Sequence, residues 1–363
     1  MKVGILSKHR VVNYGSFLQA FALKSMIEGM GHKVYFMDLK PEEGKDVNYL
    51  FDEPRIKRVL RNIIRKKDLT KYVDFYNARQ EMFLDKLFKK LGASRLPSYS
   101  TKYDSVLIGS DEMFNCTEEG TFWGKSMQMF GEGIDSTNIF SYAASFGYTT
   151  IDRLQQYGLE EKVAQLLKNN FKNISVRDKN SEYLVTKLTG KVPELHLDPV
   201  LIYNFDEKLP KKVKHKNYIA VYGYDNRIKE AGYIEQVKAF AKKTGKKILG
   251  IGLWQDWCDE NVLADPFEVL AYIRDADYVF CETFHGAIFS IKYNKNFVCH
   301  VRESNYNKLY NLLETLKCTD RILSPDTQIE ELFETDHNYE YANQRIFQER
   351  ERTMQYLQKN LTR

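Results

Sequence analysis

The sequence lacks the cysteine and histidine spacings that hold a structural metal. Its five cysteines, at positions 116, 258, 281, 299 and 318, form no CxxC pair and have no short spacing to a second histidine. An odd number of scattered cysteines is typical of a reduced, cytosolic chain without structural zinc. We therefore expect a cytoplasmic protein, and we assign no metal-ligating residue.

Long apolar runs and a strong charge of one sign are also absent. No run reaches the about 18 apolar residues of a membrane-spanning helix, and residues 1–7 open directly into a strand pattern without a signal core. The formal net charge of +5 is mild and favours small anionic ligands or a membrane surface over nucleic acid. We expect a protein that is neither secreted nor membrane-spanning and that binds no nucleic acid. Gly250 and Gly252 lack the third glycine of a dinucleotide fingerprint, so an NAD site is not supported.

What the sequence does contain is a regular alternation of short apolar runs with helical patterns. Apolar runs occur at residues 2–7, 33–39, 105–108, 138–143 and 173–176, and again at 218–222, 247–253, 277–281 and 297–301. This order is typical of parallel sheets covered by helices. We expect an α/β protein with two Rossmann-like doubly wound domains facing a cleft.

The lysine-rich stretch 204–216, with Pro210, predicts the link between the domains. We expect an N-terminal α/β domain at 1–205, a C-terminal α/β domain at 206–335, and a C-terminal helix at 336–363 that packs back on the N-terminal domain. Residues 55–67 predict a basic amphipathic helix. Its apolar face either lies on an anionic membrane or packs on its own domain, and the pattern leaves both open.

His285 is the residue most indicative of chemistry. It follows the apolar run 278–281 and precedes a helical pattern that begins at Gly286, so it lies at the carboxyl end of a predicted strand. Ligands of open α/β sheets bind at that edge, where a helix N-terminus also favours anions. With an ordinary pKa of about 6.5, a histidine there can exchange a proton near neutrality. A purely structural hydrogen bond is the alternative.

Polar residues follow several strands of the first half in the same way. Residues 13–19 join the first strand to its helix, so the N–H groups of Gly15 and Ser16 can hold a phosphate or carboxylate, or Ser16 is a plain helix cap. Ser110 and Asp111 end another strand, where Asp111 can orient a sugar hydroxyl or accept its proton, unless the segment is only a turn.

Arg177 ends a further strand and offers a fork to phosphate or carboxylate, with an ion pair to Asp178 or Asp198 as the alternative. Near residue 306, Arg302 and Lys308 are further cationic candidates in the second domain.

Taken in order, several short motifs resemble the polysaccharide pyruvyl transferase family over roughly residues 3–325. They are Asn13-Tyr-Gly with Leu18-Gln-Ala20, Gly109-Ser-Asp111, Ser141-Tyr-Ala-Ala-Ser-Phe-Gly147, Ser175-Val-Arg177, Leu197-Asp-Pro199 and Thr283-Phe-His-Gly286. The resemblance implies a fold similar to GT-B glycosyltransferases, phosphoenolpyruvate as donor substrate without a further cofactor, and a glycan acceptor. The product would be a pyruvate ketal on a sugar, with a lipid-linked hexose at the inner membrane face as the expected acceptor.

The resemblance also implies roles for individual residues. His285 matches the family histidine and would be the general acid. The expected donor-binding residues are Arg177, Gly286, Thr283, Lys308, Gly15 and Ser16, and the expected acceptor-binding residues are Asn13, Ser110, Asp111 and Ser145.

The chain departs from the family pattern at some of these positions. Thr283 stands where some members carry arginine, Glu112 and Phe114 where Gln and Trp are frequent, and Lys308 where arginine is common. The alternatives are a glycosyltransferase that uses a nucleotide sugar and a catalytically silent binding member of an assembly complex.

Overall fold

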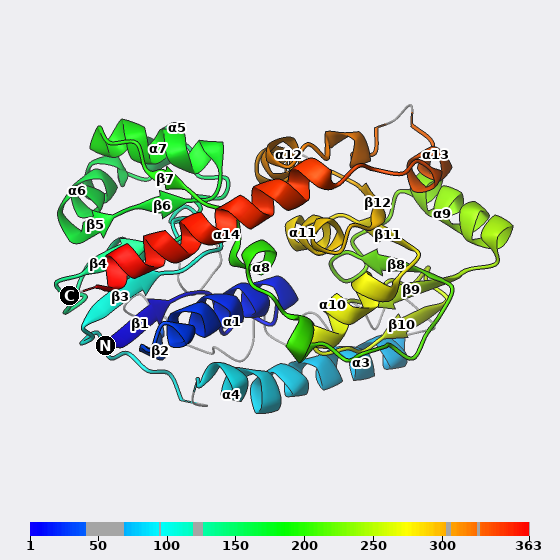
Figure 1. The fold of residues 1–363 in the computed structure, drawn as a ribbon, viewed down its shortest axis with the longest axis horizontal. Helices are drawn as coiled ribbons and strands as arrows, with labels where there is room; N and C mark the ends of the chain where they lie inside the picture. Colours follow the sequence, from blue (N-terminus) through cyan, green and yellow to red (C-terminus); the bar gives the residue numbers. More distant parts are fainter. Residues whose placement is uncertain (41–68, 94–95, 119–125, 303–305, 325–326, 363) are drawn as a thin grey trace. The chain divides into compact units, whose positions relative to one another are not determined.

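A computed structural model describes residues 1–40, 69–93, 96–118, 126–302, 306–324 and 327–362 of the chain (Figure 1). These residues divide into two compact units. Unit 1 contains residues 1–40, Phe83–Tyr203 and the chain from Gln348, and unit 2 contains residues 69–82 and Asn204–Phe347. The predicted basic helix at 55–67 lies outside the described residues.

Unit 1 is built on a five-stranded parallel sheet in the order β2-β1-β3-β4-β5. The strands are β1 (Lys2–Leu6), β2 (Lys33–Met37), β3 (Ser105–Ile108), β4 (Ile139–Ser141) and β5 (Phe171–Asn173). The helices are α1 (Tyr14–Gly29), α4 (Phe88–Leu91), α5 (Ile151–Gln156), α6 (Glu160–Asn170), α7 (Lys179–Thr189) and α8 (Pro199–Ile202), with short helical turns at Phe83–Leu87 and Met127–Phe130. Strands β6 (Ser175–Val176) and β7 (Glu194–Leu195) form a small parallel sheet that an isolated bridge joins to Ala144.

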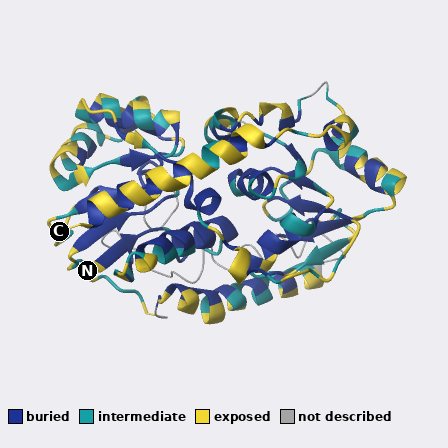
Figure 2. Ribbon diagram, in the orientation of Figure 1, coloured by how far each residue is buried: buried dark blue, intermediate teal, exposed yellow. Residues whose placement is uncertain are grey.

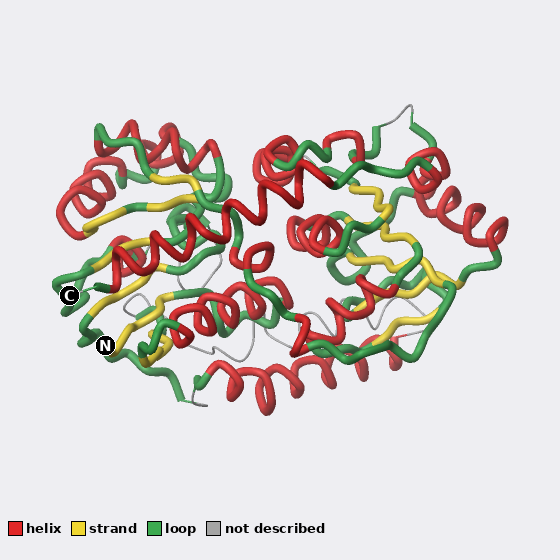
Figure 3. Tube along the Cα trace, in the orientation of Figure 1, coloured by secondary structure: helices red, strands yellow, loops and turns green. Residues whose placement is uncertain are grey.

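Unit 2 has its own five-stranded parallel sheet, in the order β10-β9-β8-β11-β12. The strands are β8 (Tyr218–Tyr222), β9 (Lys247–Ile251), β10 (Glu260–Val262), β11 (Tyr278–Cys281) and β12 (Asn296–Cys299). The helices are α3 (Leu69–Met82), α9 (Ala231–Thr244), α10 (Pro266–Asp275), α11 (Phe284–Lys292), α12 (Tyr306–Thr315) and α13 (Ile329–Glu334), with short helical turns at Asp206–Lys208 and Thr319–Arg321. Figure 3 shows the alternation of strand and helix in both units, and the predicted α/β class with two doubly wound parallel sheets is confirmed.

The central strands are apolar because they are covered on both faces. β3 and β8 are buried along their whole length, and both are dark blue in Figure 2. A parallel strand enclosed by helices reads as a continuous apolar run, which is why the sequence predicted these strands. The predicted strand at 173–176 is instead divided into β5 and β6, which belong to different sheets.

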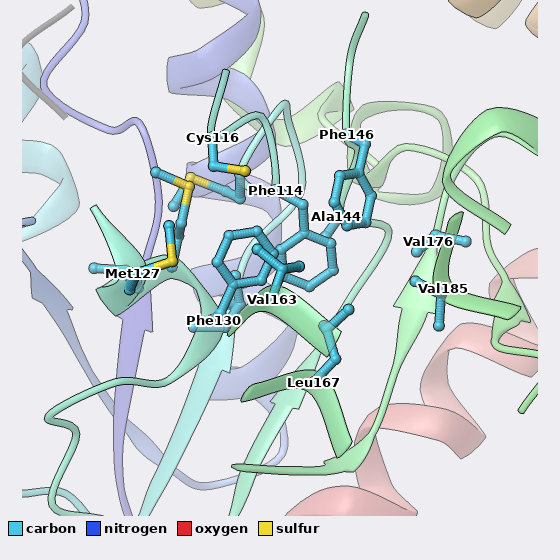
Figure 4. Close-up of a cluster of buried hydrophobic side chains, with 14 of the residues drawn as sticks. Phe114, Cys116, Met127, Phe130, Ala144, Phe146, Val163, Leu167, Val176 and Val185 are labelled. Atoms are coloured by element: carbon cyan, nitrogen blue, oxygen red, sulfur yellow. The ribbon is translucent and has the colours of Figure 1, made fainter. Parts of the chain in front are cut away.

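An aromatic cluster in unit 1 supports the segment that follows β3. Phe114 stacks on Phe130 with ring centroids 5.2 Å apart and packs against Phe146 at 5.3 Å (Figure 4). Such pairs contribute about 0.5–1.5 kcal/mol each beyond the area they bury. Phe114, a departure from the family pattern, is therefore a core residue that fixes the chain just after Asp111.

The division of the chain differs from the expected one at helix α3. The sequence assigned residues 1–205 to one domain, but α3 belongs to unit 2 and the boundary falls between Tyr203 and Asn204. The reason is side-chain pairing that no local pattern reveals. Arg79 forms an ion pair with Asp225, and Phe75 packs edge-on against Trp254.

Helix α14 (Glu340–Leu361) contributes its residues from Gln348 onward to unit 1. Tyr356 donates a hydrogen bond to the Ser141 carbonyl at the end of β4. The Asn360 carbonyl accepts a hydrogen bond from the Asn138 side chain, just before that strand. This part of α14 thus completes hydrogen bonds of the unit 1 sheet. No helix within the described residues is long and apolar enough to cross a membrane.

Candidate functional site

Each sheet has one point at which the strand order reverses. In unit 1, β1 lies between β2 and β3, and in unit 2, β8 lies between β9 and β11. Ligands of open parallel sheets bind outside the carboxyl ends of the strands at such a switch point, because the loops diverge there. The loops after β1 and β3 carry Asn13 and Asp111, and the first turn of α11, directly after β11, carries His285.

Asn13 is the N-cap of α1, with extended backbone (φ −141°). Its Oδ1 accepts hydrogen bonds from the backbone N–H of Gly15 at 2.8 Å and of Ser16 at 3.1 Å. The expected N–H groups for a donor anion at Gly15 and Ser16 are thus engaged in the cap. The Ser16 hydroxyl does not cap the helix, and it donates to Oδ2 of Asp111 at 2.7 Å.

Asp111 has a backbone conformation that residues other than glycine rarely adopt, with φ of 85°. Its carboxylate accepts hydrogen bonds from Ser16 and from the backbone N–H of Glu112, 2.9 Å away. Its backbone carbonyl accepts from the N–H of Ser145 at 2.9 Å. Strain of this kind persists only where surrounding contacts hold it, and it gathers at functional sites.

Arg177 lies between two carboxylates. Its Nη1 is 2.9 Å from Oδ2 of Asp198 and its Nη2 is 3.4 Å from Oδ1 of Asp111, while the Arg177 side chain is only 2% exposed. Burial opposes its charge, but Asp111 and Asp198 outweigh burial and raise the pKa of the guanidinium. The ion pair with Asp198 is one of the alternatives that the sequence left open.

Ser110 and Ser145 hold neighbouring carboxylates in place. Ser110 donates to Oδ2 of Asp198 at 3.3 Å. Ser145 donates to Oδ2 of Asp178 at 2.6 Å, and Asp178 in turn caps α7. Hydrogen bonds therefore connect all the unit 1 residues that the sequence singled out: Asn13, Gly15, Ser16, Ser110, Asp111, Ser145 and Arg177.

In unit 2, Thr283 is the N-cap of α11, and its Oγ1 accepts from the backbone N–H of Gly286 at 3.0 Å. This N–H, expected to face the donor, is thus engaged in the cap. A Cβ on Gly286 would lie 2.7 Å from Cβ of Cys281, so only glycine lets the first turn of α11 pack so close to β11.

His285 is the second residue of α11 and is half-buried. Its ring packs near Phe284 and Phe289, with centroid distances of 5.4 and 6.0 Å. The expected placement of His285 at the carboxyl end of a strand is therefore what the structure has. Lys308 is half-buried in the first turn of α12.

The sequence indicated Arg302 as a cationic candidate but did not predict the ion pairs that it forms in unit 2. Nε of Arg302, which follows β12, lies 2.6 Å from Oε2 of Glu282, the residue before Thr283. Nη2 of Arg302 donates to the Arg227 carbonyl at 2.8 Å and lies 3.1 Å from Oε2 of Glu230. Burial raises the pKa of Glu282, although Arg302 opposes this. The usable signal was position, because Glu282 and Arg302 each follow a strand at the same edge of the sheet.

The described part of the chain contains no group of three or more His, Cys, Asp or Glu side chains that could hold a metal ion.

Solved structures with a similar backbone include a glycotransferase of kitacinnamycin, a calicheamicin glycosyltransferase, and UDP-GlcNAc 2-epimerase from Neisseria meningitidis bound to UDP-GlcNAc. The first is 10% identical over 99% of each chain, with a TM-score of 0.47. The second is 11% identical over 99% of this chain and 98% of that chain, with a TM-score of 0.43. The epimerase is 10% identical over 99% of this chain and 100% of its own, with a TM-score of 0.42. Similarities at this level carry no argument about activity.

None of the curated proteins compared with the chain matches it. A family model for polysaccharide pyruvyl transferase matches residues 13–304. The match starts at the N-cap of α1 and ends beyond β12, so it includes the Asp111 network of unit 1 and the His285 turn of unit 2. Because the match covers well over half of the sequence and includes both switch points, the chain belongs to the polysaccharide pyruvyl transferase family.

Proposed function

We propose that the protein transfers the enolpyruvyl group of phosphoenolpyruvate to two hydroxyls of one sugar and forms a pyruvate ketal. The observation that carries the proposal is the family match, together with a histidine on the first turn of α11 at the switch point of unit 2. In the reaction, the donor methylene gains a proton and becomes a methyl group. One hydroxyl adds to the neighbouring carbon, and a second hydroxyl then displaces phosphate. Of the two hydroxyl hydrogens, one restores the proton given to the methylene and one leaves as a proton.

His285 is the proposed source of the proton for the methylene. Histidine is the side chain that most often serves as a general acid, and a positioned acid of this kind accelerates a reaction by about 10²–10⁴. Its place after β11, with Gly286 packed against Cys281, fixes the backbone that carries the ring.

Unit 2 is the proposed donor side, because its cations lie at the same sheet edge as His285. Phosphoenolpyruvate carries a phosphate and a carboxylate, both of which an arginine fork suits. We add Arg302 to Lys308 as a donor-binding side chain of unit 2, because Thr283 and the N–H of Gly286 are bonded to each other in the cap of α11. Arg302 is held by Glu282, the residue before Thr283. In members with arginine at position 283, that arginine would supply charge that Arg302 provides here.

Unit 1 is the proposed acceptor side. Asp111 is suited to orient a sugar hydroxyl and to accept its proton, because its carboxylate is held by Ser16 and its side chain is 15% exposed. Asn13, Ser110 and Ser145 support this arrangement through the helix cap, Asp198 and the Asp111 carbonyl. The acceptor we propose is a lipid-linked hexose, a precursor of a surface polysaccharide, met at the cytoplasmic face of the membrane.

The test is phosphate release from phosphoenolpyruvate with a panel of lipid-linked and aryl hexosides, followed together with the mass of the acceptor. We expect release that depends on the acceptor, ketal formation on the sugar, and loss of both in His285→Ala. Thermal stabilisation of the wild type by phosphoenolpyruvate reports donor binding separately. Stabilisation by a nucleotide sugar but not by phosphoenolpyruvate would contradict the proposal and favour glycosyl transfer.

A further inference from the structure

We propose that Arg177 is a positioning residue for Asp111 and not a ligand of phosphoenolpyruvate. This inference takes the identity of the donor from the proposed function. The contacts of Arg177 with its carboxylates are independent of that proposal. The guanidinium is the middle of a chain of contacts that begins at α8, passes through Asp198 and ends at the Asp111 carboxylate.

The charged side chains that act most strongly on Arg177 are carboxylates. The carboxylates of Asp111, Asp198, Glu112 and Asp178 all raise the pKa of the guanidinium, and they do so strongly enough to overcome its burial. A donor phosphate entering this region would meet these negative charges at close range, in a place where little water screens them. Arg302 also pairs with two carboxylates, Glu282 and Glu230, but a second cation, Arg227, acts on Glu282 there, so an anion meets less uncompensated negative charge beside Arg302 than beside Arg177.

Asp198, at one end of this series of contacts, is held rigidly. The Asp198 side chain is fully buried, its Oδ1 accepts from the backbone N–H of Val200 at 3.0 Å, and its Oδ2 accepts from Ser110. The backbone of Arg177 is itself held, since its N–H donates to the Ala144 carbonyl at 3.2 Å. A buried carboxylate fixed by a helix cap and a hydroxyl is a suitable anchor for one arm of a guanidinium fork.

Asp111, at the other end of this series of contacts, is the residue whose carboxylate has to be held in place. Asp111 has a left-handed backbone and a side chain that is 15% exposed, whereas its counterpart Asp198 is 0% exposed. Of the two carboxylates paired with Arg177, Asp111 is thus the one that can meet a substrate. Without Arg177, only Ser16 and the Glu112 N–H among the contacts given above would orient the carboxylate.

The test compares Arg177→Met with Arg302→Met as a matched variant from unit 2. For each protein, binding of phosphoenolpyruvate is measured by thermal stabilisation, and transfer to the best hexoside is measured as kcat and KM. We expect Arg177→Met to bind phosphoenolpyruvate within about twofold of the wild type while kcat/KM for the acceptor falls by about 100-fold, and Arg302→Met to lose about tenfold in donor binding. Arg177→Lys, which keeps the positive charge, should recover part of the kcat/KM for the acceptor that Arg177→Met loses. A loss of donor binding in Arg177→Met as large as in Arg302→Met would overturn the assignment.

A second measurement keeps the assignment testable if Arg177→Met folds poorly or if the donor is not phosphoenolpyruvate. Urea unfolding of Arg177→Lys, Asp111→Asn and the double variant gives the coupling between the two side chains. We expect the folding equilibrium constant of the double variant to differ at least about threefold from the product of the single effects. Additive effects would overturn the positioning role, whichever donor binds. If the wild type ignores phosphoenolpyruvate and the coupling is present, the proposed function fails while the positioning of Asp111 stands.

Discussion

The switch points of the two units occupy equivalent places in their sheets but carry different side chains. In unit 1, the guanidinium of Arg177 is surrounded by carboxylates, and its closest partners are Asp111 and Asp198. In unit 2, His285 lies in the first turn of α11, and Arg302, which follows β12, pairs with Glu282 and Glu230. Equivalent positions in the two sheets thus carry different groups: an arginine between two aspartates in unit 1, and a histidine with an arginine paired to two glutamates in unit 2.

The strand orders make the comparison sharper. Counted along the chain within each unit, the order is 2-1-3-4-5 in unit 1 and 3-2-1-4-5 in unit 2. In both orders the chain reverses beside the first strand of the unit, so the loops that carry Asp111 and His285 emerge at the reversal. The location of a site is therefore set by topology, and its chemistry is set by the few side chains that the loops carry.

The largest effect is expected at His285. We expect His285→Gln to lower kcat for transfer by about 10²–10⁴, because glutamine can hydrogen-bond but cannot donate a proton as an acid. Phosphoenolpyruvate should still stabilise the variant, which thermal unfolding measures alongside phosphate release. Unchanged turnover in His285→Gln would remove the chemical distinction between the units.

The next effect is expected at Asp111. Asp111→Asn keeps a side chain that tolerates left-handed backbone but loses the negative charge. We expect kcat/KM for the acceptor to fall by about 100-fold, with donor binding retained. Asp111→Gly is the comparison for strain: like Asp111→Asn it removes the carboxylate that pairs with Arg177, but glycine adopts φ of 85° readily, so the difference between the two variants in urea unfolding reports the backbone strain. Loss of donor binding in Asp111→Asn would contradict the division of roles.

A smaller effect concerns the packing that fixes His285. Gly286→Ala should destabilise the protein by about 1–3 kcal/mol, because the new Cβ would lie 2.7 Å from Cβ of Cys281. Gly232→Ala, within α9, is the matched control. No atom lies within 4 Å of its added Cβ, and alanine should stabilise that helix by up to about 1 kcal/mol. Equal stability of the two variants in urea would show that the first turn of α11 can move away from β11.

The smallest expected effect is a difference between the two units in how the stability of the fold depends on pH. Asp38 is bound by Arg10 and by the Ser98 N–H; burial opposes its charge, but hydrogen bonds from His9 and Arg10 prevail and lower its pKa to about 2. A lowered pKa contributes stability above the unfolded value of about 3.9, here about 2 kcal/mol, which is lost as pH falls through 2.

Glu282 has the opposite sign, because burial raises its pKa. The stability gained by its neutral form in the fold is present below the unfolded pKa of about 4.3 and is lost as pH rises through the folded pKa. We expect Asp38→Asn to flatten the acid side of the stability profile and Glu282→Gln to raise stability at neutral pH relative to acid pH. Urea unfolding of both variants between about pH 2 and 7 measures the two slopes. Slopes of the same sign would contradict this difference between the units.

The sequence predicted the parts of the site that depend on local pattern. Buried parallel strands read as apolar runs, and residues that follow them gather at one sheet edge, so Asn13, Asp111 and Arg177 could be grouped before their contacts were known. His285 could be placed for the same reason. Such a pattern predicts where a residue lies in the fold, but not which group its side chain contacts.

The rest depends on contacts between distant parts of the chain. The pairing of Arg177 with Asp111 joins residues 66 apart, and that of Arg79 with Asp225, which assigns α3 to unit 2, joins residues 146 apart. The caps at Asn13 and Thr283 were within reach of the sequence, because both residue types are preferred at that position. Their consequence is that N–H groups expected to meet the donor are already used.

The contacts of α14 have a consequence for the order in which the chain can fold during synthesis. Unit 1 begins with β1, yet Tyr356 and Asn360 supply hydrogen bonds to Ser141 and Asn138. A ribosome adds about 5–20 residues per second, and domains generally fold as units once they have emerged. Unit 2 is therefore fully translated before unit 1, although unit 1 starts first. Until residue 360 emerges, β4 lacks the contacts that α14 makes with it, and the apolar surface there stays exposed. A chaperone that shields nascent apolar surface would therefore act on unit 1 for longer than on unit 2.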